Sequence, residues 1–401
     1  MTETGQSPRV VVTALGLVQI LTWGSSFYFP AVFAGPIAAE TGWPLAFVVG
    51  GVSIGLLVGG LISPQIGRLI GRHGGRLPLS ASSVLFAAGL AGIGLAPSLP
   101  LYLAAWAIVG LGMGAGLYDA AFAALSHLYG GKARASITTL TLIGGFASTI
   151  CFPFSAFLLE TIGWRGACFV YAGLHLAFAL PLHLAVLRPA HSASVKNNVG
   201  EEAEPANPGI AHRRAIIVVL ALILSLVAGI GSIMVVHLLT FLQARGIAFA
   251  AAVSLGMLLG PAQVGARLIE RLFGQNYHPL WTLLAATALM CIGLLLLLAS
   301  PHLVALAIIL YAAGYGISWI ARGTVPLAIF GARHFPVVMG RLALPSLIAQ
   351  ALAPTFGAIL IERTGVLATI AILAGLSAIS LALMPVLWRL TGTSDRHRTP
   401  A

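Results

Sequence analysis

Charged side chains are scarce in this sequence. Its 401 residues include 21 Lys and Arg and 10 Asp and Glu, so only 8% of the chain is charged, whereas 59% is hydrophobic. A soluble domain carries about 25% charged residues, and a chain this apolar cannot cover itself with a polar surface. The composition argues against a soluble globular protein and predicts an all-α integral membrane protein whose solvent is the lipid bilayer.

Cysteine is almost absent, and the three present, Cys151, Cys168 and Cys291, lie inside apolar runs. None has the Cys-x-x-Cys or Cys/His spacing of a metal or redox site, so we expect small buried hydrophobic residues and no metal. The sequence also lacks a Walker phosphate-binding loop, a His-Glu-x-x-His zinc motif and a Gly-x-Ser-x-Gly nucleophile elbow. It predicts no enzyme, no cofactor and no use of ATP by this chain.

The formal net charge of +11 does not indicate nucleic-acid binding, because the cations are scattered in short breaks between apolar runs. Splitting the chain at these breaks gives twelve runs, each long enough to cross about 30 Å of hydrocarbon as a helix. The runs lie near residues 10–34, 44–65, 77–96, 101–128, 135–159, 167–187, 214–243, 249–266, 280–299, 303–331, 342–361 and 365–390. The first is too long for the apolar core of a signal peptide and is expected to span the membrane.

One long polar segment, residues 188–213, is rich in Pro, Ser, Asn and mixed charge, as is typical of a linker. It divides the chain into two six-helix bundles, 1–187 and 214–401. The bundles repeat one another, because "RLIGR" at 68–72 returns as "RLIER" at 267–271, each between the second and third helix of its half. Both copies keep the same orientation, which predicts pseudo-symmetric halves related by an axis along the membrane normal.

The distribution of Lys and Arg predicts the orientation, because the cytoplasmic loops of membrane proteins are enriched in cations. With the N-terminus inside, only Arg165, Arg245 and Arg363 fall in outer loops. The cations on the inner side are then Arg9, Arg68, Arg72, Arg76, Lys132, Arg134, Arg188, Lys196, Arg213, Arg214, Arg267, Arg271, Arg333, Arg341, Arg389, Arg396 and Arg398. We therefore expect a multi-pass inner-membrane protein with both termini in the cytoplasm.

Twelve helices, a central cytoplasmic linker and the loop "GRLIGRHGGR" at 67–76 resemble the major facilitator superfamily. The superfamily signature in that loop is roughly Gly-x-Leu-a-Asp-r-x-Gly-r-r. The residues that match it in register are Gly67, Leu69, Arg72, Gly74 and Arg76. The resemblance covers essentially the whole chain, and it implies two six-helix bundles that rock about a central site and carry one substrate per cycle.

The resemblance also implies a cytoplasmic gate. In the superfamily the acid of this loop contributes to a charge relay that holds the cytoplasmic side closed, but here that position is Gly71. The corresponding position of the second half is Glu270, so the relay is expected there alone. The expected gate residues are Gly67, Arg68, Arg72, Arg76, Arg267, Glu270 and Arg271. Some monocarboxylate carriers bind substrate with an arginine of the eighth helix, and Arg267 could have that role instead. The internal repeat aligns Arg267 with Arg68, which favours the gate.

Three segments resemble the monocarboxylate and oxalate/formate branch of the superfamily: "ETGWP" at 40–44, "GLGMGAGLYDA" at 110–120 and "YAAGYGISW" at 311–319. The drug/proton antiporter branch carries a Gly-x-x-x-Gly-Pro-x-x-Gly-Gly signature in its fifth helix. The fifth helix here reads "GGFASTICFPFSAF", which does not fit that spacing. This mismatch argues against a function in drug efflux, which stays open as the alternative.

Two ionisable side chains lie inside spanning runs, where charge is costly and marks function by default. Asp119 is the only carboxylate well inside an apolar run, and Arg322 lies at a similar depth in the tenth run. Aligning the two halves on their glycines places Asp119 one residue from the repeat position of Arg322. We hypothesise that the two form a pair that substrate or a proton breaks during the cycle. A static buried pair, or an Arg322 that extends to the inner surface, is the structural alternative.

The first helix carries "QILTWGSSFYFP" at 19–30, whose polar groups must face other helices or a cavity rather than lipid. The residues expected to line a substrate cavity are Trp23, Ser26, Tyr28, Tyr118 and Trp319, and ordinary helix packing is the alternative for each. Three further residues, His175, His183 and His237, could relay protons but are more simply read as hydrogen-bonded core histidines.

A buried cation with few carboxylates nearby favours an anionic substrate, because a guanidinium donates two parallel hydrogen bonds to a carboxylate. The sequence therefore predicts a secondary active transporter of a small, monocarboxylate-like organic anion. We expect Asp119 to couple transport to protons and Arg322 to bind the anion. The expected partners are the substrate, protons and the lipid bilayer, with no nucleic acid, and the chain is expected to act as a monomer. Proton-driven efflux of amphipathic drugs or toxic compounds is the alternative.

Overall fold

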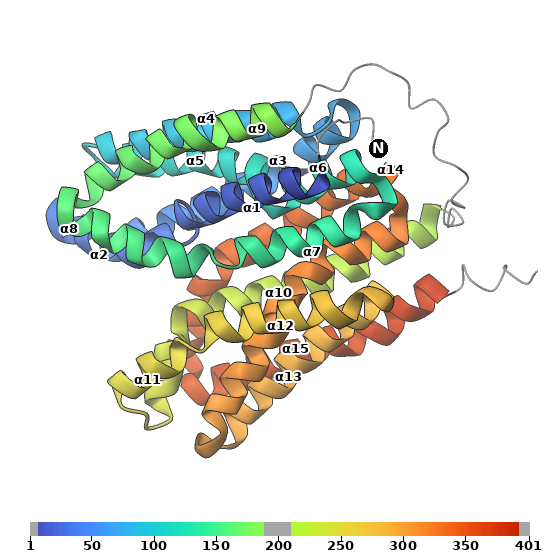
Figure 1. Ribbon diagram of the computed structural model, residues 1–401. Helices are drawn as coiled ribbons and strands as arrows, with labels where there is room; N and C mark the ends of the chain where they lie inside the picture. The colour runs from blue at the N-terminus through green and yellow to red at the C-terminus, as the bar shows by residue number, and fades with distance from the viewer. Residues whose placement is uncertain (1–6, 188–209, 393–401) are drawn as a thin grey trace, which may run out of the picture. The chain divides into compact units, whose positions relative to one another are not determined.

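The structure is a computed structural model of the chain and describes residues 7–187 and 210–392, all of whose elements are helices (Figure 1). Before the gap these are α1 (Pro8–Gly24), α2 (Phe29–Thr41), α3 (Leu45–His73), α4 (Arg76–Leu95), α5 (Leu99–Gly116), α6 (Tyr118–Tyr129), η1 (Gly130–Lys132), α7 (Ala133–Gly144), α8 (Ala147–Leu174), η2 (His175–Ala179) and α9 (Leu180–Val186). After it follow α10 (Ile210–Ala244), α11 (Phe249–Gly256), α12 (Leu259–Phe273), η3 (Gly274–Asn276), α13 (Pro279–Ala299), η4 (Pro301–Leu303), α14 (Val304–Thr364) and α15 (Val366–Gly392). Of the linker expected at 188–213, residues 188–209 lie outside the described residues, and residues 210–213 belong to α10.

Nine stretches of helix within the described ranges are long and apolar enough to cross a membrane. Two of them exceed one crossing, since Leu99–Val186 has 88 residues and Val304–Thr364 has 61, against about 20 for one crossing. Large apolar side chains on these helices are half exposed or more, including Leu61, Leu101, Phe157, Leu222 and Ile379. A bilayer surrounds such side chains with an apolar solvent, so their exposure there does not carry the free-energy cost that it would carry in water.

The chain divides into two compact units. Unit 1 comprises residues 1–191 and 332–351, and unit 2 comprises residues 192–331 and 352–401. Helix α14 contributes to both because it is interrupted at Gly331, whose φ of 67° and ψ of 162° are not helical. A residue with a Cβ rarely adopts positive φ, so glycine permits this break. Each unit is described by itself.

In unit 1, α3 packs along α5, and α4 packs against both α5 and α8. Glycines bring α3 and α5 together: a Cβ on Gly110 would lie 2.5 Å from the carbonyl oxygen of Gly55, and one on Gly114 would lie 2.6 Å from that of Gly59. Small residues at these positions let the two backbones touch, which is how helices associate where no hydrophobic effect drives them together.

In unit 2, α10 and α13 both pack against α15. A buried apolar cluster joins these helices to the first part of α14, with Phe241, Leu294, Ile308 and Leu373 as members from the four elements. Each of these four side chains is at most 1% exposed. The first part of α14, which carries Arg322, is therefore anchored on one side by an apolar core.

The segment 67–76 is helical for most of its length, which corrects the expectation of a loop. Helix α3 continues to His73 and ends at Gly74, where φ is 78°, and α4 begins at Arg76. Arginine is a good helix former, so the charged end of the span continues as helix and only Gly74 and Gly75 form the turn. The related segment 267–271 likewise lies inside α12.

The first apolar run is also interrupted. Helix α1 ends at Gly24, and α2 begins at Phe29 with Pro30 in its first turn. Proline offers no backbone N–H to the preceding turn, so it begins a helix more readily than it continues one. Ser26 and Tyr28 consequently lie in the connection between the two helices rather than on a helical face shared with Trp23.

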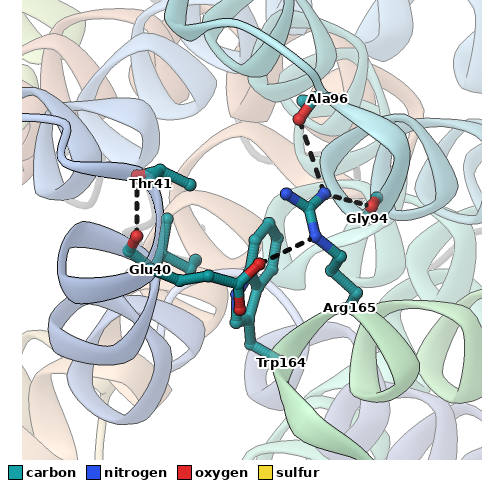
Figure 2. Close-up of polar contacts among 7 residues, drawn as sticks. Glu40, Thr41, Gly94, Ala96, Trp164 and Arg165 are labelled. Carbon is teal, nitrogen blue, oxygen red and sulfur yellow. Dashed lines mark hydrogen bonds and ion pairs between the residues drawn. The ribbon is translucent and has the colours of Figure 1, made fainter.

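An ionic cluster ties the ends of α2 and α4 to the middle of α8, directly after the break at Gly163, in unit 1 (Figure 2). Arg165 Nε donates to Glu40 Oε1 at 3.1 Å, and Trp164 Nε1 donates to Glu40 Oε2 at 2.7 Å. Arg165 also donates to the carbonyl oxygens of Gly94, at 2.8 Å, and Ala96, at 3.5 Å. Its guanidinium carbon lies 4.2 Å from the ring centroid of Trp164. A cation that the sequence assigned to an outer loop therefore joins two helix ends to the break inside α8.

Candidate functional site

Unit 1 contains a break in the fourth apolar run, bridged by a buried glutamine. The run expected at 101–128 forms α5 and α6, separated at Leu117, which is extended (φ −75°, ψ −175°). Gln19 of α1 donates from Nε2 to the carbonyl oxygen of Gly116 at 2.7 Å, and its Oε1 accepts from Trp23 Nε1 at 3.2 Å. Gln19 is 1% exposed, so it satisfies polar atoms at a place that water does not reach.

Asp119 lies in the first turn of α6 and is half-buried. The sequence placed it within a continuous fourth helix, and the structure corrects this, because the helix restarts one residue before it. The first turn of a helix presents N–H groups without intrahelical partners and a partial positive charge, which favour a carboxylate. The position of Asp119 therefore has a structural explanation, and it also places an ionisable group in the interior of unit 1.

Three of the aromatic residues expected to line a cavity come together in unit 1. The ring centroid of Trp23 lies 5.2 Å from that of Tyr118 and 6.5 Å from that of Tyr28. Phe152 of α8 extends the group, 5.4 Å from Tyr28. Ser26 has a different role, because its hydroxyl donates to the carbonyl oxygen of Thr22. One member of this aromatic group, Tyr118, directly precedes Asp119 in the chain.

Two of the histidines are fully buried in unit 1, and each contacts a serine. His175 Nε2 lies 2.9 Å from Ser25 Oγ, and His183 Nδ1 lies 3.1 Å from Ser83 Oγ. The His175 ring stacks on Phe86 with a centroid distance of 4.7 Å, and it begins the π-helical turn η2. These contacts join the helix that carries both histidines to α1 and α4, as core histidines do.

Unit 2 contains a cavity bordered by Arg322. This residue of α14 is 5% exposed, and its guanidinium carbon lies 5.5 Å from the ring centroid of Trp319. The cavity lies between α10 and α14 and is lined by Leu224, Val227, Ala228, Tyr315, Ser318, Trp319 and Arg322. Sequence reasoning identified Trp319 and Arg322 and missed the others. The spacing of Tyr311, Tyr315 and Trp319 at intervals of four was a signal for one helical face, whereas nothing in the sequence indicated the residues from α10.

Asp119 belongs to unit 1 and Arg322 to unit 2. The pairing of the two charges, inferred from the internal repeat, therefore stays a prediction. Each has a defined environment in its own unit: Asp119 at a helix start beside an aromatic group, and Arg322 in the wall of a cavity.

At the C-terminal end of α3, glycine permits a close contact within unit 1. A Cβ on Gly67 would lie 2.3 Å from the carbonyl oxygen of Pro336, and one on Gly340 would lie 2.4 Å from that of Ser63. A Cβ on Gly71 would meet only the Pro336 side chain at 3.6 Å and that of a neighbouring valine at 3.8 Å, which are ordinary contact distances. The nearby cations differ in exposure: Arg68 and Arg72 are exposed, and Arg76 is half-buried.

The corresponding residues of the second half have different environments. Arg267 is 4% exposed and donates from Nε to the carbonyl oxygen of Gly316 at 2.9 Å. Glu270 is 8% exposed and accepts from Thr282 Oγ1 at 3.1 Å, and Arg271 is half-buried. Arg68, the repeat counterpart of Arg267, is exposed, so the two halves use equivalent arginines differently.

Comparison with protein-family models matches residues 15–277 to the Major Facilitator Superfamily. Among solved structures, the chain is similar to the human organic anion transporter MFSD10 (TETRAN), with 17% identity over 94% of this chain and 100% of that one and a TM-score of 0.73. It is also similar to the proton:xylose symporter XylE (14% identity, 95% and 96% covered, TM-score 0.72). A third similar structure is the E. coli fucose:proton symporter FucP (14% identity, 95% and 99% covered, TM-score 0.68). At these identities the similarity shows a common fold and not a common substrate. No significant match is found among curated protein sequences.

Proposed function

This chain belongs to the major facilitator superfamily, and on that premise we propose that it is a secondary active transporter that moves a small, monocarboxylate-like organic anion together with protons. Members of this superfamily are transporters, and the apolar helices make the chain a multi-pass membrane protein. Arg322 carries the proposal for the substrate's charge, because it is a buried cation in the wall of a cavity. A carboxylate matches the fork of guanidinium N–H groups.

The proposed architecture is twelve membrane-spanning helices in two six-helix bundles joined by the cytoplasmic linker. The 88-residue stretch Leu99–Val186 is long enough for three crossings and the 61-residue stretch Val304–Thr364 for two. With one crossing for each of the other stretches, the count becomes twelve. The cation distribution favours an inner-membrane location with both termini cytoplasmic, and we propose that a monomer is the functional unit.

Asp119 is the proposed proton carrier. It is an ionisable group inside a membrane-spanning segment, where such groups serve proton relays more often than packing. It is half-buried at the start of α6, so its carboxyl group is partly accessible. Trp23, Tyr28 and Tyr118 are proposed to form the wall beside it, and Ser26 contributes by shaping the connection between α1 and α2.

The inner end of α3 is the proposed cytoplasmic gate. The Gly67 contact with the segment that contains Pro336 and Gly340 supports this role, because it is a backbone contact that a small movement would open. The cations proposed to act there are Arg68, Arg72, Arg76 and Arg271, with Arg267 and Glu270 as the buried members of the second half. Gly71 supplies no acid, so helix contact replaces charge in the first half.

The printed names of two similar structures agree with parts of this proposal, since one is an organic anion transporter and another a fucose:proton symporter. The argument for this chain depends on its own residues. The test is reconstitution of the purified protein in liposomes with an imposed proton gradient and radiolabelled acetate, lactate, benzoate and xylose. We expect inward proton gradients to drive carboxylate accumulation, and a protonophore to abolish it.

Two variants with matched controls decide the residue roles. Asp119→Asn should lose proton-driven accumulation but keep substrate exchange, whereas Glu160→Gln, at an exposed carboxylate of α8, should change neither. Arg322→Gln should lose affinity for the anion. Arg213→Gln should keep it, because Arg213 also lies over an aromatic ring, 5.7 Å from that of Phe330, without lining the cavity. Intact accumulation in Asp119→Asn, or intact affinity in Arg322→Gln, would overturn the corresponding role.

A second candidate function is proton-driven efflux of amphipathic cations. The observation in its favour is the aromatic group of Trp23, Tyr28 and Tyr118 next to a carboxylate, since aromatic faces and an acid suit a cation. Cationic dyes in the same liposomes distinguish the two. If dye moves against the proton gradient and no carboxylate is carried, the efflux function replaces the anion proposal.

A further inference from the structure

Four segments of unit 1 meet where α3 ends and α4 begins. A Cβ on Gly75, in the turn between these two helices, would lie 2.3 Å from Ala124 Cβ of α6. Ser126 Oγ, near the end of α6, donates to the carbonyl oxygen of Ala332 at 3.5 Å. The part of α14 that begins there also touches α3 through the Gly67 contact. We call this region the basic end of unit 1: the end of α3, the start of α4, the end of α6 with η1 and α7, and α14 from residue 332 to 351.

The basic end carries positive charge and no carboxylate. Residues 61–80, 120–144 and 332–351, all of which the structure describes, include no Asp or Glu. The exposed cations of these ranges are Arg68, Arg72, Lys132, Arg333 and Arg341, and the half-buried ones are Arg76 and Arg134. Like charges gathered in one region repel one another and create a positive potential around it. Because these segments supply no acid, the charge favours an anionic partner from outside the chain.

One exposed face of α3 changes from apolar to charged toward the end of the helix. Leu61, Gln65, Arg68 and Arg72 follow one another at intervals of three or four residues, so they share a helical face. All four are exposed, and Leu61 is 55% exposed. The two arginines lie roughly 10–16 Å beyond the leucine along the helix axis, at 1.5 Å per residue. An apolar side chain followed by cations matches the order of hydrocarbon and headgroups in a bilayer.

The start of α4 shows the same change within two residues. Arg76 is half-buried, whereas the side chain of Leu77, the next residue, is 62% exposed. Helix α4 has no side-chain cap and no acid in its first turn, so the partial positive charge of its N-terminus adds to that of the arginine. A soluble anion would meet the charge and leave the leucine in water. A phospholipid brings a headgroup to the cation and an acyl chain to the apolar side chain.

Gly71 lies between cations of two helices. A Cβ on Gly71 would meet the side chains of Pro336 and Val337 at 3.6 and 3.8 Å, so this side of α3 faces α14. Arg333 is exposed and lies one turn before these two residues on α14. Arg72 follows Gly71 directly on α3. An anion beside Gly71 would therefore be near arginines from both helices, at a position where the chain has no side chain of its own.

We infer that the basic end of unit 1 binds an anionic phospholipid, with the headgroup phosphate at Arg72 and Arg333 beside Gly71 and the acyl chains along Leu61 and Leu77. The fork of guanidinium N–H groups matches phosphate oxygens, which suits a surface built from arginine more than from lysine. The lipid supplies the negative charge that these segments lack. This binding surface does not depend on what the protein transports, so it goes beyond the proposed function and does not rest on it.

The test measures binding of fluorescently labelled phosphatidylglycerol to the purified full-length protein in a neutral detergent. The competitors are unlabelled phosphatidylglycerol, phosphatidylcholine and inorganic phosphate. We expect phosphatidylglycerol to compete about tenfold or more tightly than phosphatidylcholine, which carries the same phosphate without net charge. Inorganic phosphate should compete still more weakly, and raising the salt from about 0.1 M to 1 M should weaken phosphatidylglycerol binding. If inorganic phosphate competes as well as phosphatidylglycerol, the site takes a soluble anion and the lipid inference is wrong. Equal competition by phosphatidylcholine would also overturn it.

Variants locate the binding surface. The double variant Arg72→Gln/Arg333→Gln should lose about tenfold or more in phosphatidylglycerol affinity, whereas Arg363→Gln, at an exposed arginine of unit 2, should keep it. Gly71→Asp should also lose affinity, because its carboxylate takes the place of the phosphate, and Gly71→Asn, of equal shape without charge, should retain it.

A monodisperse elution profile confirms that each variant is folded. Both substituted arginines are exposed, so if Gly71→Asp does not fold, the arginine variants decide alone. Unchanged affinity in the double variant, or an equal loss in Arg363→Gln, would show that the lipid does not bind at this end of unit 1.

Discussion

The side-chain amide of Gln19 donates a hydrogen bond to the carbonyl oxygen of Gly116, 2.7 Å away, at the residue where α5 ends. The same side chain accepts from the indole N–H of Trp23. One buried residue thus satisfies the backbone at a helix break and holds an aromatic ring of the proposed cavity. Because lipid and core offer no water to replace these bonds, the break depends on this side chain.

Replacing Gln19 should destabilise unit 1 and impair transport. Gln19→Leu removes the donor to the Gly116 carbonyl, a buried acceptor whose loss of a partner costs about 1–3 kcal/mol, and it also removes the hydrogen bond from the Trp23 indole N–H. Gln19→Glu keeps the acceptor for Trp23 and loses the donor to Gly116, so its effect should be intermediate. The measurement is the unfolding midpoint in detergent together with benzoate uptake. Gln243→Leu, at an exposed glutamine of α10, should leave both unchanged; equal effects at the two positions would contradict this account.

Substitution near the C-terminal end of α3 should have different effects at two glycines that look alike in the sequence. Gly67→Ala places a methyl group 2.3 Å from the Pro336 carbonyl oxygen, so the two segments must move apart. Gly71→Ala meets ordinary contact distances and should be tolerated. We expect Gly67→Ala to raise the accessibility of a cysteine introduced at Pro336 to a membrane-impermeant thiol reagent, and Gly71→Ala to leave it unchanged. The native cysteines are buried and serve as the background. Equal labelling of both variants would show that the contact does not close this end.

Much of the fold follows from the apolar pattern, whereas the breaks do not. The run at 101–128 is largely apolar whether it forms one helix or two, because buried apolar residues look the same on either side of Leu117. The hint lay in the glycines before it, which weaken a helix by about 1 kcal/mol each relative to alanine. At the end of α3 the prediction was wrong in the opposite direction. Glycines and charges indicated a loop, whereas the chain is helical to His73.

The candidate site was predictable where charge is unusual and not where packing decides. Asp119 and Arg322 stand out because ionisable residues are rare in apolar runs. Leu224, Val227 and Ala228 resemble any other apolar residues of α10, and only the folded chain places them opposite Tyr315 and Trp319. Gln19 was visible as a polar residue, but its role depends on a carbonyl that becomes available where α5 ends.

The ionic cluster of unit 1 should respond unequally to loss of its two charges. Glu40 and Arg165 have side chains that are 53% and 40% exposed, and exposed ion pairs contribute about 0–1 kcal/mol. Glu40→Gln keeps an acceptor for Trp164, so we expect a loss of less than about 1 kcal/mol. Arg165→Ala also removes the donors to Gly94 and Ala96 and the stacking on Trp164, so its unfolding midpoint should fall further. Urea or thermal unfolding in detergent orders the two variants, and the reverse order would show that the ion pair dominates.

Proton and anion binding should be linked through Asp119 and Arg322 even when no membrane is present. If one cycle carries both, the anion must bind more tightly to the protonated protein, and by reciprocity anion binding must draw a proton from solution. In weakly buffered detergent solution, with benzoate fully ionised, adding benzoate should raise the pH measured with an indicator dye. Asp119→Asn should bind benzoate without this proton uptake, and its affinity should no longer fall as the pH is raised. Arg322→Gln should abolish the proton uptake because the anion no longer binds, and Glu160→Gln should behave as the unsubstituted protein. Undiminished proton uptake in Asp119→Asn would assign the coupling to another group.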